Sequence, residues 1–269
     1  MIGGGVMGEA LLSRLLSQGL YAPDEILVGE PSPERCQVLG EQYAVRTTGD
    51  NREVIAASKV ILLAVKPQIF NVVAKDFQEV HCEMLPLVLS ILAGVPLAQL
   101  EDAMPDWPVV RAMPNTPSTV GAGMTAISLG SHTSPQHGKL AQEIFSAVGE
   151  VVQVPEGMMD AVTGLSGSGP GYVSIVIEAL ADGGVASGLP RAIAQKLAIQ
   201  TVLGTAQLLQ TTGMHPAELK DRVTSPGGTT IAGIACLEEL GMRSALIEAV
   251  RTASSRSREL GKPTSLPTS

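Results

Sequence analysis

Two kinds of hydrophobic pattern divide the chain near residue 154. Before that point, short apolar runs rich in β-branched residues alternate with segments in which apolar residues recur at helical spacing. A short continuous apolar run is typical of a strand buried on both faces of a sheet, and a helix between two such strands makes a βαβ unit. The first half therefore predicts a parallel, doubly wound sheet. The predicted strands are 26–28, 60–65, 87–91 and 109–110, and the predicted helices are 9–18, 33–42 and 67–77.

The second half of the chain carries helical spacing alone. We predict an all-α domain over 155–269, behind an α/β domain over 1–154. Residues 173–180 are apolar on more than one face of their helix, which indicates burial against a partner subunit as well as within the chain. The tail, 262–269, is expected to fray. The predicted helices are 170–187, 191–209, 215–223, 230–240 and 243–260.

Charge and composition narrow the classes of partner. The formal net charge is −8, and no cluster of Lys and Arg suits a phosphate backbone, so we expect no nucleic acid. The long apolar stretch at 84–100 contains two prolines and is shorter than the ~20 residues that a membrane helix needs, so we expect no membrane segment. No export signal precedes the first helix, and three isolated cysteines suit a reducing compartment. We therefore expect the cytoplasm.

A glycine motif opens the first predicted helix. It reads Gly3-Gly4-Gly5-Val6-Met7-Gly8 and matches G-x-G-x-x-G, the fingerprint of dinucleotide binding. The first glycine permits a tight turn, the second lets a pyrophosphate approach the backbone, and the third allows close packing of helix and sheet. The motif alone is weak evidence. Its position before a helix, with an acid after the next predicted strand, strengthens the interpretation.

That acid, Glu30, stands where a Rossmann domain recognises the adenosine ribose. A carboxylate there hydrogen-bonds the 2′-OH and favours NAD(H), whereas Ser32 and Arg35 would suit the 2′-phosphate of NADP(H). Cofactor preference stays open between the two. The simpler alternative is that Glu30 is an ordinary surface acid.

The first strand of a Rossmann sheet is missing from the pattern. Only Met1 and Ile2 precede Gly3, where about five apolar residues are expected. We therefore expect Met1 to be an internal or misassigned start, with a short apolar run encoded in frame upstream. An in-frame stop directly before Met1 would refute this expectation.

Further loops follow the predicted strands and point to one crevice. Ligands of open α/β sheets bind outside the carboxyl ends of the strands, where this chain places 64–68, 93–95 and 111–117. Ordinary connecting loops are the alternative. In the helical half, Gly227 and Gly228 leave bare N–H groups at a helix start, which would cradle a carboxylate, although Thr229 as a plain helix cap is the simpler interpretation there.

Taken in order, these segments resemble pyrroline-5-carboxylate reductase over essentially the whole chain. The resemblance rests on the glycine motif, Ala-Val-Lys-Pro-Gln, Arg-Ala-Met-Pro-Asn-Thr-Pro, Asp-Ala-Val-Thr-Gly-Leu-Ser-Gly-Ser-Gly-Pro and Leu-Lys-Asp-Arg-Val-Thr-Ser-Pro-Gly-Gly-Thr-Thr. It implies hydride transfer from NADH or NADPH to the C=N bond of 1-pyrroline-5-carboxylate, giving L-proline in the last step of proline biosynthesis. It also implies a Rossmann domain with a helical dimerisation domain, in a homodimer or a larger homo-oligomer of dimers.

The resemblance implies residue roles as well. Thr230 would hydrogen-bond the ring nitrogen of the substrate with Ser225 beside it, and these two are the expected catalytic residues. Arg222 departs from the Asn of many relatives, and Glu30 is more acidic than is usual in NADP-preferring members. The expected substrate contacts are Glu156, Gly227, Gly228, Thr229 and Thr230, and the expected cofactor contacts are Gly3, Gly4, Gly5, Val6, Met7, Gly8, Glu30, Ser32, Arg35, Asn51, Ala64, Val65, Lys66, Pro67, Ala93, Gly94 and Asn115.

Two other functions compete with this interpretation. A related Rossmann reductase of a 2-hydroxy or 3-hydroxy acid would carry a Lys and an Asn on its first C-terminal helix, and 170–187 contains neither. A dinucleotide-binding protein without turnover would have no use for a carboxylate cradle. We expect no metal, because the four histidines lack ligand spacing; His215 is expected to serve a helix start.

Overall fold

The computed structural model describes residues 1–261, and the expectation for the tail at 262–269 lies outside the described residues. The chain divides into two compact units: Met1–Ser168 together with the segment from Thr252 on, and Gly169–Arg251. We call these the first and second units and describe each by itself. The predicted boundary after residue 154 concerns function and stays a prediction.

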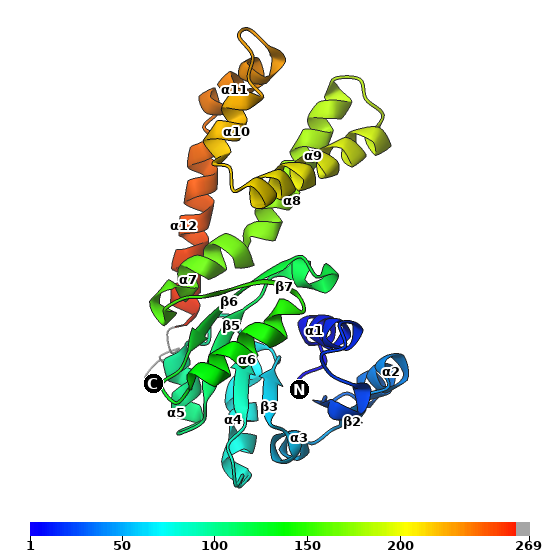
Figure 1. Ribbon diagram of the computed structural model, residues 1–269, viewed down its shortest axis with the longest axis vertical. Helices are drawn as coiled ribbons and strands as arrows, with labels where there is room; N and C mark the ends of the chain where they lie inside the picture. The colour runs from blue at the N-terminus through cyan, green and yellow to red at the C-terminus, as the bar shows by residue number, and fades with distance from the viewer. Residues whose placement is uncertain (262–269) are drawn as a thin grey trace, which may run out of the picture. The chain divides into compact units, whose positions relative to one another are not determined.

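The first unit is built on strands in the order β1-β2 and β3-β4-β5-β6-β7 (Figure 1). β1 and β2 are parallel, as are β3, β4 and β5. β6, however, runs antiparallel to β5, and β7 is parallel to β6. The bounds are β1 Leu27–Gly29, β2 Arg46–Thr48, β3 Val60–Leu63, β4 Leu87–Ser90, β5 Val109–Met113, β6 Gly123–Leu129 and β7 Gly149–Gln153.

The expectation of a wholly parallel sheet was therefore wrong at one edge. A parallel pair needs a long crossover connection, whereas a short connection suffices for an antiparallel pair. β5 and β6 are joined only by a short loop with the 3-10 turn η3 (Thr116–Val120), so the chain turns back on itself there. Helix α6 (Pro135–Ser146) then supplies the crossover that makes β6 and β7 parallel.

Ile2 occupies the central position of the missing first strand. It bridges Gly29 and Leu63 in parallel, and its N–H donates to the Leu62 carbonyl at 2.8 Å. Ile2 is 1% exposed, so this position is as buried as the centre of a doubly wound sheet should be. A cavity of about 470 Å³ opens beside Met1. The cavity wall is mostly apolar and includes Leu12, Leu15, Leu27, Val60, Leu62 and Ile144.

Helices cover both faces of this sheet, as a doubly wound fold requires. One core contains Leu11 and Leu12 of α1 with Phe145 of α6, and the other contains Phe70 and Phe77 of α4. Phe77 meets Trp107 edge to face, with ring centroids 5.1 Å apart. The helices other than α6 are α1 Val6–Ser17, α2 Pro33–Tyr43, α3 Asn51–Ala57, α4 Phe70–Glu79 and α5 Leu97–Ala103.

The first unit continues past β7 through η4 (Glu156–Met158), α7 (Met159–Val162) and the π-helix η5 (Thr163–Gly167). The end of α12 (Met242–Leu260) returns to it, where the Ser257 hydroxyl donates to Asp160 Oδ1 at 2.7 Å. The first unit therefore includes the last turns of the chain that the structure describes.

The second unit consists of helices, and residues 155–261 contain no strand, which confirms the prediction for this described part. Helices α8 and α9 pack around a small buried cluster of Ala181, Ala194 and Ala198, with Ile177 and Val185 partly buried against it. The Tyr172 hydroxyl also donates to the Ala249 carbonyl at 3.4 Å. Among the described residues, no helix is long and apolar enough to cross a membrane. The helices are α8 Gly169–Ala186, α9 Arg191–Thr212, α10 Pro216–Arg222, α11 Thr229–Glu239 and the first part of α12.

Candidate active site

The glycine motif forms a compact turn that leads into α1. Gly3 has φ +100°, a conformation that favours glycine. A Cβ at Gly3 would lie 2.7 Å from the Ala64 carbonyl oxygen, and one at Gly8 would lie 2.5 Å from the Gly3 oxygen. A Cβ at Gly5 would meet nothing within 4 Å. The turn is thus closed by backbone on its inner side and open at Gly5.

This open side suits the pyrophosphate of a dinucleotide. Gly5 is the N-cap of α1, and no side chain caps the helix. The N–H groups of the first turn have no acceptor inside a helix, and the helix dipole adds a partial positive charge at the same place. Backbone donors at an uncapped helix start bind phosphate groups well. The residues present therefore fit the cofactor, and the individual contacts of residues 3–8 stay predictions.

The three residues predicted to recognise the ribose lie together beside this turn. Glu30 follows β1, and its Oε2 accepts the Gly4 N–H at 2.9 Å while its Oε1 accepts the Ser32 N–H at 3.2 Å. Arg35 Nε donates to the Gly4 carbonyl at 2.8 Å, and its guanidinium also forms an ion pair with Glu9. Glu30 is therefore part of the glycine turn and not a plain surface acid.

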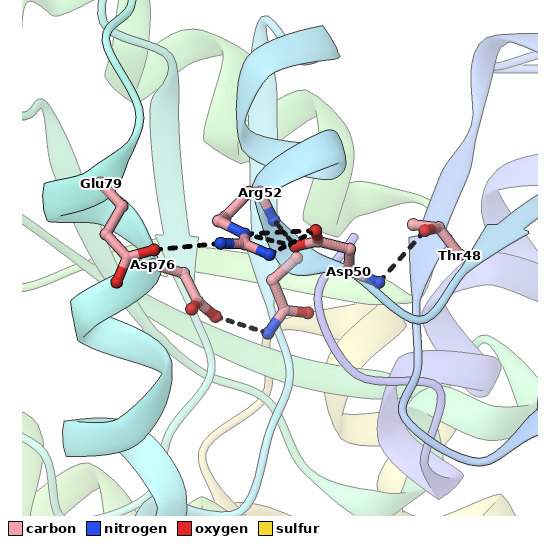
Figure 2. Close-up of polar contacts among 6 residues, drawn as sticks. Thr48, Asp50, Arg52, Asp76 and Glu79 are labelled. Atoms are coloured by element: carbon pink, nitrogen blue, oxygen red, sulfur yellow. Dashed lines mark hydrogen bonds and ion pairs between the residues drawn. The ribbon is translucent and has the colours of Figure 1, made fainter.

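Asn51 lies next to the same strand end, as the first residue of α3. Its Nδ2 donates to Asp76 Oδ2 on α4 at 2.8 Å. Its Oδ1 faces Gly29, where a Cβ would lie only 2.8 Å away. Asp76 thus sets which way the amide of Asn51 points. Figure 2 shows two adjoining ion pairs, in which Arg52 binds both Asp50 and Glu79. The hydrogen bond from Arg52 lowers the pKa of Asp50.

The next predicted cofactor contacts follow β3 and β4. Ala64 lies under the glycine turn, since the Gly3 backbone packs against its carbonyl. Gly94 has φ +75° and lies beside the end of α12, where its Cβ would be 3.5 Å from Leu260. These loops share the carboxyl edge of the parallel strands. The 470 Å³ cavity lies at the opposite edge, where these strands begin, and so is not the predicted crevice.

Glu156, a predicted substrate contact, lies in a buried ion pair. Its Oε1 accepts from Arg111 Nη1 at 2.5 Å and from the Leu97 N–H at 3.0 Å. Arg111 is 4% exposed, and this carboxylate compensates its buried charge. Glu156 Oε2 is buried and has no hydrogen-bond partner among the described residues. The carboxylate therefore ties η4 to β5 and to the start of α5.

Asn115, a predicted cofactor contact, clamps the π-helix. Its Nδ2 donates to the Ser166 carbonyl at 3.1 Å, and its Oδ1 accepts the Met124 N–H at 2.9 Å. π-Helices are rare and occur often at functional sites. Both ends of the amide are engaged, so the Asn115 side chain positions the segment 163–167.

The predicted carboxylate cradle lies in the second unit. Gly227 has φ +66°, and Gly228 is the N-cap of α11. No side chain caps this helix, so the alternative of Thr229 as a cap was wrong: Thr229 is the first residue of α11. A Cβ at Gly228 would lie 2.3 Å from Ser225 Oγ, which explains the glycine. Thr230, half-buried, follows in the first turn.

Two histidines and Arg222 have local roles. His215 is the N-cap of α10, and its Nδ1 accepts the Ala217 N–H at 3.2 Å, which confirms the expected helix start. His137 caps α6 with Ser134. Arg222 pairs with Glu218 one turn earlier at 2.8 Å. The described residues include no group of three His, Cys, Asp or Glu side chains that would hold a metal; the absence of a metal stays a prediction.

The structure thus brings the predicted cofactor residues 3–8, 30–35, 51 and 64 together in the first unit, whereas residues 225–230 lie in the second. Sequence reasoning missed three residues that hold predicted site residues in place: Glu9 pairs with Arg35, Asp76 with Asn51, and Arg111 with Glu156. Asp76 could have been noticed as an acid on the predicted helix 67–77. Arg111 begins the loop motif at 111–117, but its ion pair with Glu156 joins two distant segments, so no local sequence pattern indicates it.

Two family models match the chain in succession. The one described as NADP oxidoreductase coenzyme F420-dependent matches residues 1–94, and the one described as pyrroline-5-carboxylate reductase dimerisation matches residues 156–260. The order agrees with an α/β half followed by a helical half. The fold class, a Rossmann-type sheet with a helical C-terminal domain, is therefore confirmed.

Similar proteins span the same length. A pyrroline-5-carboxylate reductase of Synechocystis sp. is 60% identical over 97% of both chains, and one of Methanosarcina acetivorans is 48% identical over 97% of both. Among solved structures, the reductase of Coxiella burnetii superposes with a TM-score of 0.92 at 36% identity over 97% of both chains. The Plasmodium falciparum enzyme with NADP bound gives 0.85 at 28% identity over 97% of both. At this identity and coverage, the chain belongs to the pyrroline-5-carboxylate reductase family.

Proposed function

We propose that this chain reduces 1-pyrroline-5-carboxylate to L-proline with NADH or NADPH, the last step of proline biosynthesis. The observation that carries the proposal is the 60% identity over 97% of both chains to a pyrroline-5-carboxylate reductase. The uncapped glycine turn before α1, with Glu30 beside it, supports binding of a dinucleotide. The bound cofactor supplies a hydride from C4 of its dihydronicotinamide to the C=N carbon, the ring nitrogen takes up a proton, and the products are L-proline and the oxidised dinucleotide.

In this proposal, the first unit binds and orients the dinucleotide. The first turn of α1 holds the pyrophosphate by its N–H groups, and Glu30, Ser32 and Arg35 border the adenosine ribose. Residues 64–67 and 93–94 line the nicotinamide half, with Asn51 toward the adenosine half. Holding two reactants in an attack geometry lowers a barrier by about 7 to 11 kcal/mol in well-oriented systems. Positioning is therefore the main contribution of these residues.

The cradle at residues 225–230 binds the substrate carboxylate through backbone N–H groups. The Thr230 hydroxyl hydrogen-bonds the ring nitrogen, and Ser225, whose hydroxyl packs against Gly228, keeps the cradle in shape. We retain Glu156 as a proposed substrate neighbour because its Oε2 has no partner among the described residues. An imine is already electrophilic, so no nucleophilic side chain is required.

The chain works in an assembly of its own copies, in this proposal as a homodimer or a larger oligomer built from dimers. The match of residues 156–260 to a dimerisation family supports this. We assign cofactor binding to 1–154 and substrate binding with dimerisation to 155–269. We further propose that it acts in the cytoplasm without nucleic acid or membrane partners. Its net charge of −8 argues against a nucleic-acid partner.

A direct assay tests the function. Purified protein with 1-pyrroline-5-carboxylate should oxidise NADH or NADPH, followed as loss of absorbance near 340 nm, with formation of proline. Thr230→Ala should lower kcat by ~10- to 1000-fold, as loss of one positioned donor does, while Thr230→Ser keeps the hydroxyl and should retain most activity. No proline from either cofactor would overturn the function, and equal rates for Thr230→Ala and wild type would remove Thr230 from the mechanism.

A further inference from the structure

Glu30 holds a fixed position at the end of β1. Its two carboxylate oxygens accept separate backbone N–H groups, Gly4 at 2.9 Å and Ser32 at 3.2 Å. Turning the carboxylate away would leave two half-buried donors without an acceptor, which is costly. A negative charge therefore stays beside the glycine turn, where the adenosine ribose of a Rossmann cofactor is recognised.

Arg35, the cation that would suit a 2′-phosphate, is already neutralised. Its guanidinium pairs with Glu9, and its Nε donates to the Gly4 carbonyl at 2.8 Å. The hydrogen bond from Arg35 is the main cause that lowers the pKa of Glu9, so this carboxylate stays ionised. Tyr43 adds a hydrogen bond to the other Glu9 oxygen at 3.0 Å. Arg35 thus joins α2 to α1 as a bound ion pair.

Ser32 offers no spare donor either. Its hydroxyl accepts the Arg35 N–H at 3.3 Å as the N-cap of α2 and donates to Glu34 Oε2 at 2.8 Å. The corner therefore presents three carboxylates, Glu9, Glu30 and Glu34, against the single guanidinium of Arg35. Arg46 starts β2 opposite Leu27, at the far end of this short strand pair.

We propose that this corner makes the chain select NADH over NADPH, with Glu30 as the residue that determines the choice. The carboxylate accepts a hydrogen bond from the ribose 2′-OH of NADH, whereas the 2′-phosphate of NADPH meets a fixed like charge and an arginine bound elsewhere. Like charges placed together at an interface disfavour the wrong ligand strongly. The proposal rests on the proposed function for its choice of cofactor pair.

Binding measured without the imine tests selectivity separately from turnover. Quenching or enhancement of dinucleotide fluorescence gives the Kd of NADH and of NADPH for the intact protein, and we expect NADH to bind about tenfold tighter or more. A Kd for NADPH equal to or below that for NADH would overturn the proposal. Failure to reduce the imine would count against the proposed function alone, because these two Kd values would still decide selectivity.

Two variants separate the contributions. Glu30→Gln removes the charge and keeps an acceptor for the Gly4 N–H. The Kd for NADPH should therefore fall, and the ratio of the Kd for NADPH to the Kd for NADH should move toward one. Glu9→Gln frees the Arg35 guanidinium, so it should also lower the Kd for NADPH and leave the Kd for NADH unchanged. Glu41→Gln, which removes an exposed carboxylate from the same helix α2, is the matched control and should leave the ratio unchanged. A ratio unaffected by both test variants would overturn the assignment to this corner.

Arg35→Gln distinguishes the rival arrangement. If Arg35 bound the 2′-phosphate, this variant would raise the Kd for NADPH and leave the Kd for NADH unchanged. That result would contradict the proposal. We expect instead no selective loss of NADPH, because the guanidinium is committed to Glu9 and Gly4. Thermal unfolding of each variant checks that the glycine turn still folds.

Discussion

At the scale of single residues, the site depends on side chains that hold other side chains. Asn51 is the predicted cofactor contact, but Asp76 determines its orientation through one hydrogen bond of 2.8 Å (Figure 2). An amide that has lost its partner can rotate, and its donor and acceptor then exchange places. Asp76 is therefore a positioning residue in this structure.

Asp76→Ala should weaken dinucleotide binding without abolishing it. One hydrogen bond contributes about 1 kcal/mol, so we expect the Kd for NADH to rise about fivefold, measured by fluorescence titration. Asp76→Asn, which keeps an acceptor oxygen, should recover part of the affinity. Glu79→Ala on the same helix removes an exposed partner of Arg52 and should leave the Kd unchanged. An unchanged Kd in Asp76→Ala, alongside a large loss in Asn51→Ala, would show that Asp76 does not position the amide.

Residue roles were predictable only where the backbone imposes them. Gly3 and Gly8 could be identified because the motif reserves both positions for glycine: a Cβ at Gly3 would collide with the Ala64 carbonyl, and one at Gly8 with the Gly3 carbonyl. Glu30 could be identified because its distance from the glycine motif is a property of the βαβ unit. The ion pairs Arg35–Glu9 and Arg111–Glu156 could not, since each joins residues from different elements.

At the scale of elements, the most informative feature is the place of Met1 and Ile2 in the centre of the sheet. Met1 donates from its amino group to the Leu27 carbonyl at 2.6 Å. Burial lowers the pKa of this amine from 8.0 to about 5. The apolar cavity lies beside this amine.

For protein prepared to begin at Met1, stability should rise between pH 5 and pH 8. In that window the unfolded chain binds a proton at the amine and the folded chain does not, so lowering the pH favours unfolding. The full shift corresponds to about 4 kcal/mol of unfolding free energy, with no further loss from this group below pH 5. Urea unfolding across this range measures the effect.

The control is a variant with five apolar residues added before Met1. This extension moves the amine out of the sheet and fills the cavity, so its pH dependence should lack this component and its unfolding free energy should increase at every pH. An identical slope in the two proteins would show that the Met1 amine is not the titrating group.

Most of the long helices were predicted well, whereas several other elements were missed. The helices α2, α8 and α9 begin within one residue of the predicted starts, because Pro at an early helical position and Gly between segments mark their bounds. α3 and β2 were missed, since seven and three residues are too short to show a period. β6, α6 and β7 were also missed, although Ser134 and Pro135 mark the start of α6.

At the scale of the whole molecule, the second unit leaves many of its large apolar side chains exposed. Its buried cluster consists of three alanines. Large apolar residues stand exposed along its helices, among them Ile175 at 65% and Leu197 at 52%. So small a core does not stabilise a domain by itself, and the family match is to a dimerisation domain. A second copy of the chain is the partner that these helices require.

Ile175→Glu should therefore weaken the assembly. Burying an isoleucine contributes about 1.5 to 3 kcal/mol, and a carboxylate in an apolar interface costs more. We expect light scattering after gel filtration to show a shift toward the 27.9 kDa of one chain. Val38→Glu makes the same change at a 43% exposed position of α2 and should leave the mass unaltered. An undiminished assembly in Ile175→Glu would place the interface elsewhere.

The sequence by itself determined the order and type of the main elements, the glycine turn and the family. These follow from local spacing, from positions that tolerate only glycine, and from ordered motifs. The tertiary structure alone decided that β6 runs antiparallel to β5, that Glu30 binds Gly4 and Ser32, and that Arg35 is paired with Glu9. The reason is physical: periodicity reports which face of an element is buried, but the partner of a charged or polar group depends on elements that are distant in sequence and meet only when the chain is folded.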